Sequence, residues 1–172
     1  HPGANDPFDP IRSRLRVHAG RIRERGADYL LCALIDLVID EGFPVLETIG
    51  DEIEQLEEQL FAAPTRDSLQ QLHQLKRTML TVRRVLWPQR EVLNNLVHDV
   101  SGIIVEGNQV YFRDCYDHTI QIMDLIETYR DMVTGLMDIY LSAVSYRLNE
   151  VMRVLTIIAT IFIPLTFIVG LY

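Results

Sequence analysis

Apolar side chains recur at helical spacing over most of the chain, and there is almost no strand signal. Between residues 28 and 61, leucine and isoleucine return every three or four positions, but Gly42 and Pro44 interrupt the run. Glycine and proline both weaken a helix interior. The pattern therefore predicts either one kinked helix or two stacked helices in this region.

A second long helix is predicted after a short turn. Thr65 is a suitable cap for its start, because a threonine hydroxyl can accept a hydrogen bond from a free backbone N–H. The helix extends to about residue 100, and Pro88 inside it should produce a bend. The short connection makes the two helical segments antiparallel neighbours.

The third predicted helix starts near Tyr111 and continues toward the end of the chain. One apolar stripe has the 4-3-4-3-4 spacing of a supercoiled bundle: Ile122, Ile126, Tyr129, Val133, Leu136 and Tyr140. A second, offset stripe consists of Leu141, Val144, Leu148, Val151 and Leu155. A helix with two apolar stripes packs on two neighbours, as in a ring of like helices. At ~90 Å such a helix is too long for a compact domain, so the pattern predicts an all-α chain with a long stalk.

Residues 154–172 carry no charged side chain and are almost entirely apolar. About 20 apolar residues are needed to cross a bilayer as a helix. The alternative, a buried helix of a soluble domain, would show a polar edge and would be broken by Pro164, whereas membrane helices tolerate proline. We therefore favour a membrane span, with Arg147 and Arg153 placing its N-terminal side in the cytoplasm.

Composition and charge narrow the class of protein further. The chain has 172 residues, a hydrophobic share of 48% and a net charge of -8, which together exclude a disordered chain and argue against nucleic acid as a partner. Arginine dominates residues 11–25, whereas residues 36–60 contain acidic side chains and no basic one. The acidic run from Glu47 to Glu58 is either a solvated face or a collar that attracts cations, and both interpretations remain open.

Motifs of enzymes are missing from the sequence. It contains no glycine-rich phosphate loop, no HExxH element and no G-x-S-x-G element. The histidines are scattered, and none pairs with a cysteine at zinc-ligand spacing. Cys32 and Cys115 form no CxxC pair and are interpreted as reduced thiols of a cytosolic setting. We therefore expect a protein that is not an enzyme.

Three segments together carry a family resemblance. They are EVMRVLTIIATIFIPLTFIVGLY at 150–172, YFRDCYDHTIQ at 111–121, and LKR, RR and WPQRE between 75 and 91. Over about residues 10–172 the chain closely resembles the CorA family of magnesium transporters. The resemblance implies a homopentamer in the inner membrane that transports Mg²⁺ and is gated by cytosolic Mg²⁺, with Co²⁺ as a further candidate ion. It also implies an α/β domain before His1, and a Gly-Met-Asn signature and second membrane helix after Tyr172.

One face of the last helix is a candidate pore lining. Its members are spaced 3-4-3-4-3-4 and are small or weakly polar: Asn149, Met152, Thr156, Ala159, Ile163, Thr166 and Gly170. Spacing alone favours ordinary helix packing, which also selects small residues, and the resemblance reverses that preference. It implies an amide ring at Asn149, an apolar constriction at Met152 and Leu155, and a hydroxyl ring at Thr166. Ile163 departs from the methionine often found there, which leaves an apolar ring intact.

Carboxylates form a second candidate site, for a regulatory metal ion. Asp114, Asp117 and His118 lie at the start of the stalk, with Asp114 and His118 one turn apart, and Asp36 and Asp40 are also one turn apart. Acids at such spacing are usually only a solvated face. The resemblance implies that Asp114 helps to bind Mg²⁺ between subunits, and it makes Asp36 and Asp40 weaker candidates for a second ion.

The predicted organisation has five parts and two competing functions. The parts are a polar, basic connector at 1–27, an antiparallel helical pair at 28–100, a loop at 101–110, a stalk helix at 111–153 and the first membrane helix at 154–172. Within the same architecture, a zinc, cobalt or nickel transporter is the alternative. From another class, a membrane-tethered coiled-coil scaffold without transport also fits the pattern.

Overall fold

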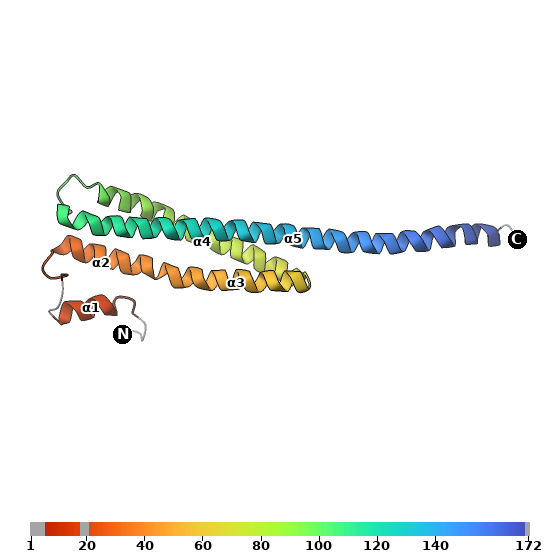
Figure 1. The fold of residues 1–172 in the computed structure, drawn as a ribbon, viewed down its shortest axis with the longest axis horizontal. Coiled ribbons are helices and arrows are strands. Elements are labelled where there is room, and N and C mark those ends of the chain that lie inside the picture. The colour runs from red at the N-terminus through yellow and green to blue at the C-terminus, as the bar shows by residue number, and fades with distance from the viewer. Residues whose placement is uncertain (1–5, 18–20, 171–172) are drawn as a thin grey trace.

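The computed structural model describes residues 6–17 and 21–170, and all regular structure within them is helical. The elements in chain order are α1 (Asp9–Arg16), α2 (Ala27–Asp40), α3 (Gly42–Ala62), α4 (Arg66–Val97), a short 3-10 helix η1 (Glu106–Asn108) and α5 (Gln109–Gly170). The all-α prediction is confirmed. Figure 1 shows that α5 runs the whole length of the molecule and that its C-terminal part projects beyond the other helices.

The predicted interruption near Gly42 separates two stacked helices. α2 ends at Asp40 and α3 begins at Gly42, so only Glu41 lies between them. Small residues let α3 approach α5 closely. A Cβ atom added at Gly42 would lie 3.0 Å from Cδ1 of Ile122, and one added at Gly50 would lie 2.7 Å from the hydroxyl of Tyr129.

α4 starts as the sequence predicts and ends slightly earlier. The hydroxyl oxygen of Thr65 accepts a hydrogen bond from the backbone N–H of Ser68 at 3.1 Å, which confirms the cap. The helix continues through Pro88 and ends at Val97 rather than near residue 100. The carboxylate of Asp99 accepts bonds from the backbone N–H groups of Ser101 and Ile104, and this turn competes with another helical turn.

The loop before α5 is held against the start of α2. Oδ2 of Asp28 accepts hydrogen bonds from the backbone N–H of Val105 and the side-chain amide of Asn108, both at 2.9 Å. These bonds stabilise the ionised form, so they lower the pKa of Asp28 below its usual value. These bonds hold the loop against α2 just before α5. The helix α5 then begins at Gln109, two residues before the predicted start at Tyr111.

The core follows a continuous seam along α5. Its buried residues lie three or four positions apart, except for a step of seven across the partly buried Tyr129, and they include most of the predicted stripe: Phe112, Cys115, Thr119, Ile122, Ile126, Val133, Leu136 and Tyr140. α3 and α4 supply the facing residues, and α4 makes the most extensive contact with α5. No described residue of α5 beyond Tyr140 is buried. α5 therefore leaves the helical bundle at that point (Figure 1).

The predicted connector at 1–27 contains a helix that the sequence pattern did not predict. α1 places Pro10 in its first turn, where a missing N–H is harmless, and it buries Ile11. Arg12 and Asp6 form an ion pair at 2.6 Å next to it. α1 lies beside α2 on the side away from α5 (Figure 1). The boundaries of the five predicted parts stay a prediction.

Candidate functional site

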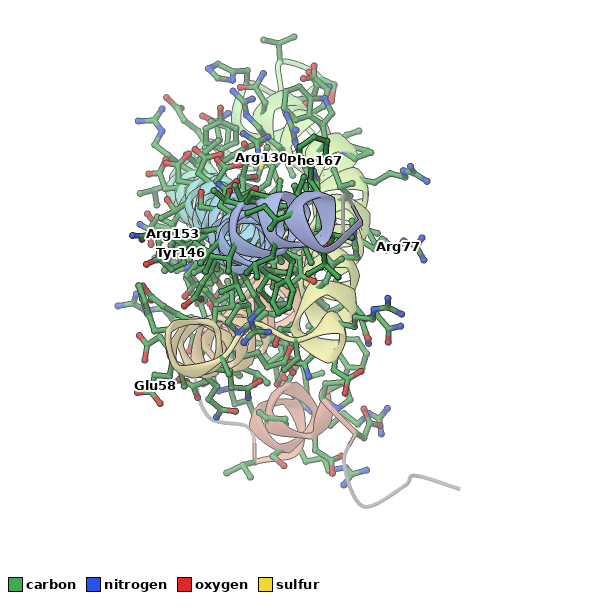
Figure 2. The ribbon with its side chains drawn as sticks, turned by 90° about the vertical axis from the view of Figure 1, so that its right-hand side faces the viewer. Glu58, Arg77, Arg130, Tyr146, Arg153 and Phe167 are labelled. Atoms are coloured by element: carbon green, nitrogen blue, oxygen red, sulfur yellow. The ribbon has the colours of Figure 1, made fainter. Side chains whose placement is uncertain are left out.

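The C-terminal half of α5 is exposed, apolar and uncharged from residue 154 to residue 170. Among the described residues, this helix is long and apolar enough to cross a membrane by length and composition. None of its most apolar window is buried inside the molecule. Figure 2 views the molecule along this helix, and the labelled side chains of Arg153 and Phe167 lie on different sides of its axis. Residues 171 and 172 of the predicted span lie outside the described residues.

The candidate pore residues lie along one side of an unbroken helix. All of them are exposed on α5: Asn149, Met152, Thr156, Ala159, Ile163, Thr166 and Gly170. The hydroxyl of Thr156 donates to the carbonyl of Met152, and that of Thr166 donates to the carbonyl of Phe162, both at 2.8 Å. Each hydroxyl hydrogen is thereby used, and the oxygen lone pairs remain free to accept bonds from water.

Leu155 lies at the edge of this face. Three residues rotate an α-helix by about 300°, so Leu155 is about 60° round the axis from Met152. The Leu155 side chain is 59% exposed, in keeping with its position on the part of α5 that has left the bundle. A ring of such side chains requires further copies of the helix, and the pore-lining assignment remains a prediction at this point.

An acid–histidine cluster joins α2 to α5, and we define it as Asp36, Asp40 and His118. Nδ1 of His118 lies 3.6 Å from Oδ1 of Asp36 and 3.5 Å from Oδ1 of Asp40. The ligand atoms of the three residues all lie within 4.8 Å of one another. Nδ1 of His118 is shielded from solvent and has no hydrogen-bond partner among the described residues.

The electrostatics of the acid–histidine cluster favour a bound cation. Burial raises the pKa of Asp36 above its usual value, and the negative charge of Asp40 raises it further. His118 acts in the opposite direction, and a smaller contribution from Asp114 again raises the Asp36 pKa. The carboxylates thus repel one another in a partly desolvated place, and a positive ion between them would remove that repulsion.

The donor set indicates which ions the cluster can hold. Two carboxylate oxygens and an imidazole nitrogen suit first-row divalent ions such as Co²⁺. Mg²⁺ prefers oxygen ligands and keeps several waters, so it would use Asp36 and Asp40 with water in the remaining positions. The cluster can therefore accept either kind of ion.

Asp114 shares a pocket with the two acids of α2. The open pocket has a volume of about 200 Å³, and its lining includes Asp36, Asp40, Asp114, Cys32 and Tyr111. The structure thus brings together three acids that lie in two separate places in the sequence. Asp114 offers its carboxylate to the same space but is not one of the three mutually close ligand residues.

His118 was noted beside Asp114 in the sequence but was not among the predicted metal ligands, which were Asp114, Asp36 and Asp40. A signal for it was present, since His118 follows Asp114 by one helical turn and shares its face of α5. Asp117 is exposed and has no contact with the acid–histidine cluster. The packing of the helices places the His118 ring against α2 and edge-on to Phe43 of α3, with ring centroids 6.1 Å apart.

Two cysteines complete the contact between α2 and α5. Sγ of Cys32 and Sγ of Cys115 lie 3.5 Å apart, and both residues are free thiols. Sγ of Cys115 also donates toward Oδ1 of Asp36 at 3.7 Å. The hydrogen bond to Cys32 and burial raise the pKa of the Cys115 thiol, so this thiol stays protonated at neutral pH.

The acidic run from Glu47 to Glu58 occupies the outer side of α3. Its carboxylates are exposed or partly exposed, while the buried side of the same helix carries Ile49, Ile53 and Leu56. Figure 2 shows Glu58 pointing away from the bundle, on the opposite side from Arg77 of α4. This arrangement fits the solvated face, and the cation-attracting collar stays untested.

Comparison with known proteins relates the whole chain to one family. Residues 1–172 match the family described as CorA-like Mg2+ transporter protein. The chain is 55% identical over 167 residues to the cobalt/magnesium transport protein CorA of Thermotoga maritima, covering 97% of this chain and 48% of that protein. It is 32% identical over 162 residues to the putative metal ion transporter YfjQ of Bacillus subtilis, covering 94% of this chain and 50% of that protein.

Solved structures give the same relationship. The complete structure of the CorA magnesium transporter from Methanocaldococcus jannaschii matches with a TM-score of 0.86 and 28% identity, over 96% of this chain and 53% of that chain. The soluble domain of the same protein matches with a TM-score of 0.70 and 27% identity, over 79% of this chain and 55% of that chain. The chain thus spans about half the length of the relatives it matches.

Proposed function

Because this chain belongs to the family of CorA-like Mg2+ transporters, we propose that the complete protein carries divalent cations, Mg²⁺ and Co²⁺ first among them, across a membrane. Members of this family are transporters, not enzymes. One observation carries the proposal. α5 leaves the bundle after Tyr140 and continues, without a break, as an exposed helix with no charge from residue 154 onward.

The proposed orientation places the helical bundle in the cytoplasm and residues 154–170 in the inner membrane. Arg147 and Arg153 lie at the boundary, where positive side chains mark the cytoplasmic side. The span buries its exposed apolar side chains in lipid or against copies of itself. The helix satisfies its backbone groups internally except at Pro164, which has no N–H to offer the carbonyl of Thr160.

We propose a homopentamer in which α5 packs against its own copies. The second predicted apolar stripe supports this, because all its members are exposed on a single chain: Leu141, Val144, Leu148, Val151 and Leu155. A groove of about 570 Å³ between the α3–α4 turn and α5 is lined by Pro64, Tyr140, Val144 and Leu148. Apolar surface of this kind is stabilised when another helix covers it.

In the pentamer the pore face would line the ion path. Mg²⁺ gives up its water reluctantly, and the waters around it are strong hydrogen-bond donors. The oxygen lone pairs of Thr156 and Thr166 can accept from those waters, since the hydroxyl hydrogens already bond to carbonyl groups of the helix. Asn149 would form an amide ring at the cytoplasmic mouth, and Met152 with Leu155 would form an apolar constriction. Such a lining passes a hydrated ion and holds it weakly.

The acids at the α2–α5 contact are the proposed regulatory site. Asp114, Asp36 and Asp40 share one pocket, and His118 adds a nitrogen donor. We propose that cytosolic Mg²⁺ bound there, between subunits, stabilises the closed ring, and that its loss loosens the subunits. The pKa of Asp36 is raised first by burial and second by the negative charge of Asp40, and a bound cation would offset both effects, which supports a cation site.

Ion uptake into vesicles tests the transport proposal. The complete protein, reconstituted in liposomes that hold a Mg²⁺-sensitive dye, should admit Mg²⁺ when the inner solution is depleted of Mg²⁺. Co²⁺ should compete with Mg²⁺, and empty liposomes are the control. Faster uptake of Zn²⁺, with no Mg²⁺ entry, would support the zinc transporter instead. A pentamer or any other oligomer that admits no divalent ion would support the scaffold.

Protease protection tests the regulatory site. Mg²⁺ should slow cleavage of the cytosolic helices in the complete protein, and Asp114→Ala should shift the protecting Mg²⁺ concentration upward by about tenfold, the loss of one charged ligand. Asp138→Ala is the matched control, since Asp138 is an exposed acid of the same helix. An Asp114→Ala midpoint equal to that of the control would remove Asp114 from the site.

A further inference from the structure

Cys32 and Cys115 are the two cysteines of this chain, and they meet across the α2–α5 contact. Their sulfur atoms lie 3.5 Å apart although the residues are 83 positions apart in the sequence. Cys32 is 3% exposed and Cys115 is 1% exposed, so both thiols sit in the packed part of the bundle. Each thiol is on a different helix, and no turn or loop of the chain brings them together.

We infer that Cys32 and Cys115 are a site of reversible disulfide formation that joins α2 covalently to α5. A disulfide has an S–S length of about 2.0 Å. The sulfurs must therefore approach by roughly 1.5 Å, which two facing side chains can share between them. The inference does not depend on transport, because it rests only on the placement of the two thiols.

A small peroxide can reach one of the two sulfurs. Cys32 lines the open pocket of about 200 Å³ that also contains Asp36 and Asp114, whereas Cys115 is not among its lining residues. A hydrogen peroxide molecule in this pocket would meet Cys32 first. Cys115 then lies behind Cys32, at a distance suited to the second step.

The reaction balances with hydrogen peroxide as oxidant. The Cys32 sulfur attacks one peroxide oxygen, the O–O bond breaks, and the departing oxygen leaves as water with the Cys32 proton, giving a sulfenic acid at Cys32. The Cys115 sulfur then attacks the Cys32 sulfur, the S–O bond breaks, and the hydroxyl leaves as water with the Cys115 proton. The two thiols lose two electrons in all, and one peroxide becomes two waters. A dithiol reductant reverses the bond by thiol–disulfide exchange.

The bond would hold the proposed metal ligands at fixed spacing. Asp36 follows Cys32 by one turn of α2, and Asp114 directly precedes Cys115 on α5. Both acids lie close to the thiol pair, with Oδ1 of Asp36 3.7 Å from Sγ of Cys115, so a covalent link there restricts sliding of α2 along α5. It also closes a loop that contains α3 and α4, which reduces the freedom of the unfolded chain.

A non-reducing peptide map tests the inference on the complete protein in detergent. After hydrogen peroxide and alkylation of remaining thiols, trypsin should release residues 26–66 linked to residues 114–130, the peptides bounded by Arg25, Arg66, Arg113 and Arg130. The linked pair should be lighter by about 2 Da than the sum of the free peptides. Dithiothreitol before alkylation should abolish it. Cys32→Ser and Cys115→Ser are the matched variants, and neither should give the linked peptide.

Thermal unfolding supplies the second measurement. The oxidised protein should unfold at a higher temperature than the reduced protein, and each serine variant should unfold at the same temperature before and after peroxide. Isolation of both peptides as unlinked, alkylated thiols after peroxide treatment of the folded protein would overturn the inference. A link found only between different chains, identified by mixing isotope-labelled and unlabelled protein, would overturn it as well. A serine variant that fails to fold is replaced by Cys115→Ala, which keeps an apolar side chain at this buried position.

Discussion

At the scale of single residues, the α2–α5 contact holds ionisable side chains in partly buried surroundings that lower the stability of the fold. Asp36 is partly buried beside a second carboxylate, and this raises its pKa. The Nδ1 atom of His118 is shielded from solvent and has no hydrogen-bond partner among the described residues. Ionisable groups in such surroundings reduce stability and are common where an ion binds. The acid–histidine cluster fits that pattern.

Asp36→Asn should make the metal-free protein more stable and less responsive to metal. An amide has no charge to desolvate and does not repel Asp40, so we expect a gain below about 1 kcal/mol, since the site is partly open to solvent. The sign follows from the raised pKa of Asp36. In the wild type, the loss of stability caused by the ionised Asp36 is complete at pH values above its folded-state pKa. This loss disappears as the pH falls toward the usual aspartate pKa of 3.8. The variant's advantage should therefore be present at pH 7 and absent below pH 3.8.

Thermal unfolding in chelator and in added Co²⁺ or Mg²⁺ provides the measurement. The wild type should gain more from metal than Asp36→Asn does. Asp138→Asn, which removes an exposed acid on α5, should change neither the metal response nor the pH profile. The proposed metal site would be contradicted if Asp36→Asn were less stable than the wild type in chelator, or if metal stabilised both proteins equally.

At the scale of elements, glycine decides how closely α3 packs on α5. The tightest approach is at Gly50, where an added Cβ would lie 2.7 Å from the hydroxyl and 3.2 Å from Cζ of Tyr129. Alanine is otherwise the better helix residue by about 1 kcal/mol. At a distance of 2.7 Å, the steric cost of the added Cβ should exceed that gain.

Gly50→Ala should destabilise the protein by about 1–2 kcal/mol, because overpacking moves the Tyr129 ring or the α3 backbone. Removing the hydroxyl should relieve the contact, so Gly50→Ala with Tyr129→Phe should recover most of the loss. Gly135→Ala serves as the control, since nothing lies within 4 Å of its added Cβ, and it should be neutral or stabilising. Chemical denaturation of the four proteins measures these differences, and a Gly50→Ala protein as stable as Gly135→Ala would contradict the close approach.

At the scale of the whole molecule, α5 links the acid pocket to the apolar span in a single helix. Asp114 and His118 lie near its start, and Met152 and Leu155 lie beyond the point where it leaves the bundle. A change of α5 position at the proposed metal site could therefore act on the proposed constriction without an intervening loop. Rigid helices that carry sites at both ends are suited to this coupling.

Leu155→Asp should turn the proposed constriction into a leak. Apolar rings block hydrated ions when they are narrow enough to exclude water, and carboxylates would hydrate the ring and attract cations. Mg²⁺ uptake by proteoliposomes, normalised to the pentamer recovered, should rise several-fold even when Mg²⁺ is high inside. Val154→Asp is the positional control: its side chain points about 100° away around the helix, so it should lower the pentamer yield and produce no leak. Wild-type uptake with normal yield for Leu155→Asp would show that Leu155 does not gate.

Much of the fold was predictable because the deciding signals are local. The 3-4 spacing on α5 reports which side is buried, the Thr65 cap bonds to a residue three positions away, and the charge-free segment from residue 154 is a property of composition alone. Each signal depends on the geometry of one helix, which every residue in it shares. The family resemblance likewise rests on contiguous motifs, and the comparisons confirm it.

Only tertiary structure decided which side chains meet between helices. His118 meets Asp36 and Asp40, and Cys32 meets Cys115, about 80 residues apart in the chain. α1 was not predicted, because its eight residues hold only two apolar side chains, Ile11 and Leu15, and a single four-residue interval is too short to establish a helical period. The sequence determined the longer helices α2 to α5, their buried faces and the apolar span, since these follow from spacing within a helix. The pairing of α2 with α5 depends on the relative rotation and shift of two helices, which the packing of the whole core sets.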